Sequence, residues 1–459
     1  MHNFRGVDMQ YTADVKIGNQ LVQGVLDTGS FELLVFTKDC KVCGNAGKLY
    51  NGTESPTYEK GRLKTKHVFG SGPAWSTEAF ETVTVGPYEA PHVSFWEVYN
   101  ADFGQLMQNS NFQSIVGVGP PGVPEAEAEI KAGEAKAKAD WWDHQVTEPL
   151  KETAPFIPVP NPLKPAAKKR ENERKYVLTR NYSLLEVYDT HKFSVCLQKP
   201  MGKEGYFIWN DDSVEMHPSY FEHVPVIGKY TWGVRLQNIR LLDPEVALSE
   251  SKGSDGFIPV GQAPSYAAVV DSGTSLLVMP TSVALNISAA LNRVDIDCDK
   301  VLLHPELLPQ LHFTIGGKSV VLPASAFLGS FVEPVPTKPS SWFRAGVVRM
   351  KCGLELMVMT EDAETQFGPL WILGMPFFRE YYTTFDLGTT SDGKNSDRAL
   401  HVAKASAQGC LPSKGVIAYQ SVDALGETHV QSWLRKVRIS QLRVPQWASK
   451  AFAKRRLHI

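Results

Sequence analysis

Two short stretches decide the fold: GVLDTGS at residues 24–30 and AVVDSGTS at residues 268–275. In each, an apolar run leads into Asp, which is followed by a small hydroxyl residue, Gly and another hydroxyl residue. One such stretch is weak evidence, because a strand that ends in an Asp turn also produces it. Each copy, however, has a later apolar-apolar-Gly triplet, IVG at 115–117 and ILG at 372–374. The two matched sets indicate that a whole lobe is repeated.

Asp27 and Asp271 are the predicted catalytic pair. Two carboxylates about 3 Å apart cannot both ionise easily, so they share one proton. The ionised carboxylate then takes a proton from a water that attacks a peptide carbonyl, and the protonated one donates to the carbonyl oxygen. The pair titrates as a unit, so neither role is assigned to one residue. Gly29 and Gly273 let the backbone approach this site without a side chain in the way.

The hydroxyl residues beside each Asp have predicted supporting roles. Ser30 and Thr274 are expected to hydrogen-bond the outer carboxylate oxygens and hold their orientation. Thr28 and Ser272 are expected to bond across between the lobes and to fix the spacing of the pair.

The remaining chain reads as a β-rich protein. Apolar and polar residues alternate at 11–18, and short β-branched or apolar runs recur at 82–85, 311–315 and 319–322. The last two flank Gly316-Gly317, which is a two-residue hairpin signal. Short strands at this spacing favour a β-rich fold.

Composition excludes some functions. The chain has 459 residues, enough for two or three domains, and its net charge of −2 gives no global field that attracts nucleic acid. The sequence contains no run of 18 apolar residues, so it predicts no membrane-spanning helix. Residues 1–7 lack the apolar region of a signal peptide. This predicts either a protein that begins in the cytosol or an N-terminus that is truncated.

Two segments depart from the β pattern. Residues from about 120 to 175 are rich in Ala, Glu and Lys, then in Pro, and end in a basic cluster at 168–175. We expect an inserted, mostly solvated and flexible segment with some helix at 124–144; a processing site at the basic cluster is the alternative. Residues 431–459 carry eight Lys or Arg, no acidic residue, and Trp433 and Trp447. This tail fits peripheral contact with an anionic membrane, or a disordered or partner-bound extension.

Cys40 and Cys43 form a C-x-x-C motif. No second C-x-x-C or spaced His pair completes a zinc site, and no βαβ pattern surrounds a redox motif. A small disulfide loop is favoured, and it implies an oxidising compartment. The sequons at Asn51, Asn181 and Asn286 fit that compartment.

Over residues 9–405, apart from the insertion, the sequence resembles the pepsin-like family of aspartic peptidases. The matching motifs are those around the two aspartates and FSV at 193–195, LWILG at 370–374 and YYTTFD at 381–386. The resemblance implies a mainly β, bilobal pepsin-like fold with the cleft between two related lobes. It also implies polypeptide substrates bound in extended form, with no metal and no organic cofactor.

The resemblance extends to the cysteines and the flap. Cys40–Cys43 matches the family's small N-lobe disulfide and Cys298–Cys352 its C-lobe disulfide. Cys196 and Cys410 have no counterpart, and we expect them to be free. The flap, which covers substrate in the family, corresponds to Phe69, Gly70 and Ser71. Phe69 replaces the usual Tyr, and Leu34 replaces the Trp that bonds its hydroxyl, so we expect Phe69 to pack on Leu34.

These features together predict an N-terminal lobe over 1–200 with Asp27, a C-terminal lobe over 201–410 with Asp271, and a basic extension over 411–459. We expect a monomeric endopeptidase, secreted or in an acidic endomembrane lumen, although no prosegment precedes Met9. The rival hypothesis is an inactive homologue that keeps the cleft to bind a peptide or protein. The intact aspartates and their flanking residues favour the enzyme. A third hypothesis is a membrane-associated module that works through the basic tail.

Overall fold

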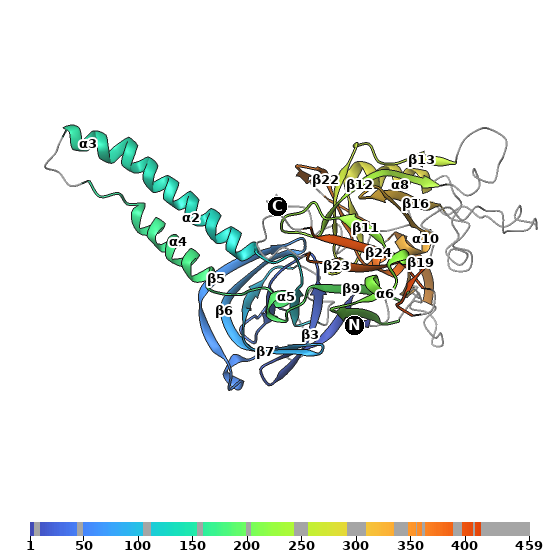
Figure 1. Cartoon of the computed structure of the whole chain (residues 1–459), viewed down its shortest axis with the longest axis horizontal. Coiled ribbons are helices and arrows are strands. Elements are labelled where there is room, and N and C mark those ends of the chain that lie inside the picture. The colour runs from blue at the N-terminus through green and yellow to red at the C-terminus, as the bar shows by residue number, and fades with distance from the viewer. Residues whose placement is uncertain are drawn as a thin grey trace, which may run out of the picture.

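The computed structural model shows a mainly β protein with two lobes side by side, and a long helical hairpin projects from the first lobe (Figure 1). This confirms the fold class predicted from the sequence. The structure describes residues 1–3, 10–43, 49–103, 112–153, 159–198, 203–242, 256–291, 309–334, 348–354, 356–359, 363–388, 397–406 and 409–414. The basic tail therefore lies outside the described residues.

The first lobe is built on one eight-stranded sheet. A further pairing between β2 (Tyr11–Ile17) and β6 (Gly72–Val85) folds the sheet back on itself. Alternating apolar side chains such as Val15, Ile17 and Val83 fill its core. The strands predicted at 11–18 and 82–85 are present. The order in the sheet is β1 (His2–Asn3), β2 (Tyr11–Ile17), β3 (Gln20–Asp27), β8 (Ser114–Gly117), β4 (Leu33–Phe36), β7 (Tyr88–Ala101), β6 (Gly72–Val85) and β5 (Glu59–Phe69).

The second lobe has a nine-stranded sheet and a short two-stranded one. The predicted hairpin is present, and Gly316 and Gly317 have φ angles of 54° and 82°, which side chains disfavour. The main path is β17 (Lys318–Leu322), β16 (Gln310–Ile315), β12 (Gly233–Leu242), β14 (Tyr266–Val270), β22 (Gly368–Leu373), β15 (Leu277–Met279) and β20 (Leu356–Val358). Strands β13 (Phe257–Pro259) and β21 (Glu364–Thr365) add to it, and β18 (Leu328–Pro334) pairs with β19 (Val348–Leu354).

A six-stranded sheet joins the lobes, because a strand that follows the first lobe pairs with a strand that follows the sheet of the second lobe. Its order is β10 (Gly205–Trp209), β9 (Lys192–Leu197), β23 (Tyr381–Asp386), β24 (Ala399–Ala405) and β11 (Glu222–Pro225), with β25 (Pro412–Ser413) on β24. Phe193 stacks on Phe385, and Trp232 meets both rings. The Trp232 indole N–H donates to the Val118 carbonyl at 3.1 Å. The largest apolar core therefore crosses the junction.

Short helices complete the two lobes. They are η2 (Gly52–Glu54), α5 (Leu184–Val187), α6 (Ser213–Met216), η4 (Pro218–Tyr220), α8 (Thr281–Leu291), α10 (Ala324–Phe327) and α11 (Met375–Glu380). In the described residues, no helix has the length and apolar content needed to cross a bilayer.

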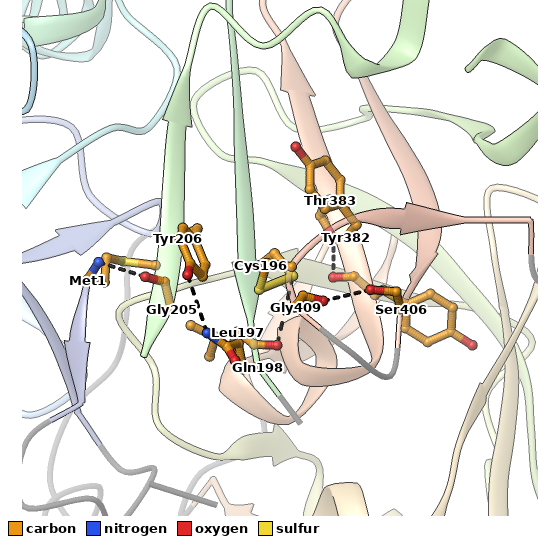
Figure 2. Close-up of a disulfide and its surroundings, with 12 residues drawn as sticks. Met1, Cys196, Leu197, Gln198, Gly205, Tyr206, Tyr382, Thr383, Ser406 and Gly409 are labelled. Carbon is orange, nitrogen blue, oxygen red and sulfur yellow. Dashed lines mark hydrogen bonds between the residues drawn. A yellow bond between two sulfur atoms is a disulfide. The ribbon is translucent and has the colours of Figure 1, made fainter. Parts of the chain in front are cut away.

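The expectation that Cys196 and Cys410 are free is wrong. They form a disulfide with a Cα–Cα distance of 5.6 Å across 214 residues of sequence, and Figure 2 shows it beside Tyr382 and Gly409. The prediction failed because the pairing depends on β24 lying beside β23, which in turn pairs with β9, and no local sequence pattern indicates this arrangement. Cys40 and Cys43 also form a disulfide. The predicted Cys298–Cys352 pair involves Cys298, which lies outside the described residues.

Removing the long-range disulfide should destabilise the protein more than removing the short one. Cys196→Ala with Cys410→Ala should lower the free energy of unfolding by about 2–5 kcal/mol, because the bond constrains a long loop of the unfolded chain. Cys40→Ala with Cys43→Ala is the matched control, since its bond spans a sequence separation of only 3. Denaturant titration of both variants measures the difference. Equal losses would contradict the loop-length argument.

In its described residues the insertion is largely helical with mostly exposed side chains, so it contains more helix than the sequence predicted. Helix α2 (Val123–Trp142) continues through a π turn, η3 (Asp143–Thr147), into α3 (Glu148–Thr153), and α4 (Lys164–Val177) returns along it. The predicted helix at 124–144 is thus present, while the basic cluster forms part of a second helix. Asn161 donates to the Ala139 carbonyl at 2.7 Å and helps to join the two helices. Their mutual packing gives order that neither helix would have alone.

Glu78 anchors the base of this hairpin to the first lobe. Its carboxylate is fully buried and accepts hydrogen bonds from the hydroxyls of Tyr176, at 3.0 Å, and Tyr182, at 2.8 Å. The backbone N–H groups of Arg62 and Leu63 on β5 also donate to it. Four donors compensate a charge that would otherwise be costly to bury.

Tyr182→Phe should therefore lower the free energy of unfolding by about 1–3 kcal/mol, because it removes one donor from a buried carboxylate. Denaturant unfolding measures the effect. Tyr99→Phe is the control, since Tyr99 is 40% exposed. Equal stabilities of the two variants would mean that the hydroxyl of Tyr182 contributes nothing to this anchor.

Candidate active site

The two repeated motifs meet at the junction of the lobes. Asp27 is the last residue of β3, and Asp271 directly follows β14. Strand β3 runs parallel to β8 with Asp27 opposite Gly117, and β14 runs parallel to β22 with Val270 opposite Leu373. The apolar-apolar-Gly triplets identified in the sequence are therefore the parallel neighbours of the Asp-bearing strands. Both aspartates are nearly buried, at 8% and 9% exposed.

Each carboxylate is held by the same two donors from its own motif. The Gly29 N–H donates to Asp27 Oδ1 at 2.9 Å, and the Ser30 hydroxyl donates to Oδ2 at 2.5 Å. In the second motif, the Gly273 N–H donates to Asp271 Oδ1 at 2.8 Å, and the hydroxyl of Thr274 donates to Oδ2 at 2.5 Å. The outer hydroxyls thus lie where the sequence predicted them.

Thr28 and Ser272 link the two motifs across the junction. The Thr28 hydroxyl donates to the Val270 carbonyl at 2.9 Å, and the Ser272 hydroxyl donates to the Leu26 carbonyl at 2.6 Å. The Ser272 hydroxyl oxygen also accepts the Thr28 N–H at 3.2 Å, and the Thr28 hydroxyl oxygen accepts the Ser272 N–H at 2.9 Å. These four bonds are buried and reciprocal, so they fix the separation of the two loops.

Each carboxylate lies against the glycine of the opposite motif. A Cβ added to Gly273 would lie 2.3 Å from Asp27 Oδ1, and one added to Gly29 would lie 2.7 Å from Asp271 Oδ2. Neither position leaves room for a side chain. The glycines predicted to allow close approach therefore do so between the lobes, not only within each loop.

The charges of the pair are coupled. Burial raises the pKa of Asp27 well above its usual range, and the neighbouring charge and the hydrogen bond of Asp271 raise it further. Bonds from Ser30 and Gly29 act in the opposite direction and are smaller. One proton can consequently remain on the pair at a pH where an isolated Asp has lost it. In the described residues, no three His, Cys, Asp or Glu side chains gather as a metal site would require.

The predicted flap residues form the turn of the β5–β6 hairpin. Phe69 ends β5, and Gly70 and Ser71 connect it to β6. The Phe69 ring meets Phe103 edge-on at 5.7 Å and packs on the apolar cluster that contains Leu34. That cluster also contains residues of β3 and β8, the strands that carry Asp27 and its parallel partner.

Comparison with known sequences agrees with this geometry. The profile of the family described as eukaryotic aspartyl protease matches residues 10–139 and 170–393. The chain belongs to the eukaryotic aspartyl protease family. The unmatched interval falls on the distal part of the helical hairpin.

Individual relatives of this chain are distant but matched over most of their length. It is 24% identical to pepsin A of Bos taurus over 399 residues, which cover 84% of each chain. It is 23% identical to gastricsin of Rattus norvegicus over 401 residues, covering 84% of this chain and 81% of that one. Pepsin II-2/3 of Oryctolagus cuniculus is 23% identical over 396 residues, which cover 84% and 80%.

One polar cluster near the site was not predicted from the sequence. Glu32, five residues after Asp27, lies 3.2 Å from His67 on β5, and both side chains are only 10% exposed. The indole N–H of Trp96 on β7 donates to the other Glu32 oxygen at 2.7 Å. The alternation of β5 could have revealed that His67 shares the face of Phe69. Its partner could not be found from sequence, because Glu32 comes from a separate loop.

Proposed function

We propose that this chain is an aspartic endopeptidase in which Asp27 and Asp271 activate a water that attacks a peptide bond. The observation that carries the proposal is the mutual contact of the two buried carboxyls, which come from repeated motifs and have matching donors. Such a symmetric pair suits a reaction in which one carboxyl accepts a proton while the other donates one.

In this mechanism the pair begins with one shared proton. The ionised carboxylate takes a proton from the water as its oxygen forms a bond to the peptide carbonyl carbon. The other carboxylic acid donates its proton to the carbonyl oxygen, which gives a neutral tetrahedral diol. Proton transfer to the leaving nitrogen then accompanies cleavage of the C–N bond. Gly29, Ser30, Gly273 and Thr274 keep the carboxylates oriented throughout, since each donates to one of them.

We further propose extended polypeptide substrates, a monomeric enzyme, and a secreted or acidic luminal location. The relatives named pepsin A and gastricsin support a protein-degrading role. The disulfides Cys40–Cys43 and Cys196–Cys410 support an oxidising compartment. Peripheral membrane contact through the basic tail stays a separate proposal. Deletion of the residues after Val430 tests it, because unchanged membrane partitioning would remove it.

The test is digestion of a denatured polypeptide across acidic to neutral pH. Because the pKa of Asp27 is raised, the shared proton persists under acidic conditions and is lost as pH rises, so the rate should fall towards neutrality. A transition-state mimic of the pepstatin kind should block the reaction. Folded protein that binds the mimic but cleaves nothing would instead support the inactive, peptide-binding alternative.

A further inference from the structure

The buried cluster of Glu32, His67 and Trp96 has no role in the proposed proton transfers. Glu32 Oε2 lies 3.2 Å from His67 Nδ1, and Glu32 Oε1 accepts the Trp96 indole N–H at 2.7 Å. The other ring nitrogen of His67, Nε2, lies 2.9 Å from the Ser76 hydroxyl. Both carboxylate oxygens and both imidazole nitrogens therefore have a polar partner.

This cluster joins two parts of the structure that the backbone does not join directly. In the part of the chain that the structure describes, β5 is the last strand of its sheet and pairs there with β6 alone. Glu32 belongs to the loop between β3 and β4, and its carbonyl accepts the Gly117 N–H at 3.0 Å. Gly117 is the residue opposite Asp27 in the parallel pair. Through His67, the edge strand β5 is tied to the loop that follows Asp27.

His67 is also placed to control the turn of the hairpin. It precedes Phe69 by two residues, so both side chains lie on the same face of β5, and their ring centroids are 6.5 Å apart. The His67 ring also meets the Trp96 ring edge-on at 5.2 Å. Because Glu32 is almost buried, loss of the imidazole would leave one carboxylate oxygen without its partner in a poorly solvated place. The side-chain contact between that loop and β5 would then be lost.

We propose that His67, with Glu32 as its partner, is a positioning residue that fixes the β5–β6 turn at Gly70 and Ser71 relative to Asp27. It touches neither the water nor the substrate peptide bond; it acts on substrate binding through the hairpin. This inference rests on the proposed endopeptidase function. His67 acts together with the apolar packing of Phe69 on this hairpin.

The kinetic test compares three variants, each normalised by titrating active sites with a pepstatin-type inhibitor. His67→Leu should raise KM for a peptide substrate at least tenfold, while kcat per titrated site changes less than threefold. His67→Asn should stay within threefold of wild type in KM, because its side-chain amide can still donate to Glu32. Lys64→Leu, on the exposed face of the same strand, is the matched control and should leave both constants unchanged. An unchanged KM per titrated site in His67→Leu would overturn the proposal.

A second readout does not depend on catalysis. Amide hydrogen exchange of residues 65–72 should be at least tenfold faster in His67→Leu than in wild type, and unchanged in His67→Asn and Lys64→Leu. If wild type cleaves nothing, the endopeptidase proposal fails, while this exchange experiment still decides whether His67 holds the hairpin. Equal exchange in His67→Leu and wild type would show that it does not.

A variant that removes the buried charge covers the case in which His67→Leu does not fold. Glu32→Gln combined with His67→Leu leaves a neutral amide that can still accept the Trp96 indole N–H. The double variant should fold and should show the same increases in KM and in exchange. Wild-type values of both in the folded double variant would overturn the proposal.

Discussion

Asp27→Asn should lower kcat for peptide hydrolysis by at least about 10³-fold, because the pair can then no longer exchange protons with the water and the substrate. Asn has nearly the same shape and keeps an oxygen that can accept the Gly29 N–H. The loss should therefore appear in kcat rather than in folding. Steady-state kinetics on a denatured polypeptide or a short peptide at acidic pH measures it.

Two controls separate chemistry from structure in this experiment. Asp189→Asn makes the same chemical change at a side chain that is 92% exposed and should retain wild-type activity. The circular dichroism spectrum and thermal midpoint of Asp27→Asn should show a folded protein. If folded Asp27→Asn digests substrate as fast as wild type, the pair is not the catalytic centre.

Gly273→Ala should reduce kcat/KM by at least about 10²-fold, because the pair tolerates little displacement. The new Cβ would lie 2.3 Å from Asp27 Oδ1 and 2.6 Å from its Cγ, a separation that real Cβ atoms essentially never show. Either the carboxyl or the loop after Asp271 must move. The shift would spoil the contact between the two carboxyls even though both remain in the sequence. Kinetics and inhibitor affinity should both report this loss.

Gly133→Ala is the matched control for that substitution. Gly133 lies on the exposed side of α2, and nothing lies within 4 Å of the position its Cβ would take. Alanine favours a helix interior by about 1 kcal/mol over glycine, so this variant should be as stable as wild type or slightly more stable. Its activity should be unchanged. Wild-type kinetics for Gly273→Ala would mean that the loops adjust freely and that their spacing is not critical.

Local pattern was sufficient for the elements that lie next to one another in the chain. The alternation at 11–18 gave β2, and Gly316-Gly317 gave the turn between β16 and β17. These features depend on side-chain alternation and on backbone conformations that glycine can adopt. Both are determined by residues that are neighbours in the sequence. The pairing of each Asp-bearing strand with the strand of its apolar triplet is a longer-range feature. The sequence still indicated it, because the second Asp motif and its triplet repeat the first.

Features that depend on distant partners were missed or misjudged. The basic cluster at 168–175 is largely exposed, as its composition predicts, but no local pattern showed that Tyr176 and Tyr182 beside it reach a buried Glu78 on β6. Cys196 looks like an isolated core residue, yet it pairs with Cys410, which lies 214 residues later in the sequence. In each case the partner is 98 residues away or more, so no window of sequence contains both groups.

By itself, the sequence determined the two lobes, the residues around Asp27 and Asp271, and the hydroxyls that support them, because this chemistry is repeated within a few residues of each Asp. Only the tertiary structure decided how the site is closed and held. It placed each carboxylate against the glycine of the other motif and brought Glu32 to His67. The physical reason is that burial and charge compensation depend on which strands become neighbours, and that is a property of the folded chain rather than of any one segment.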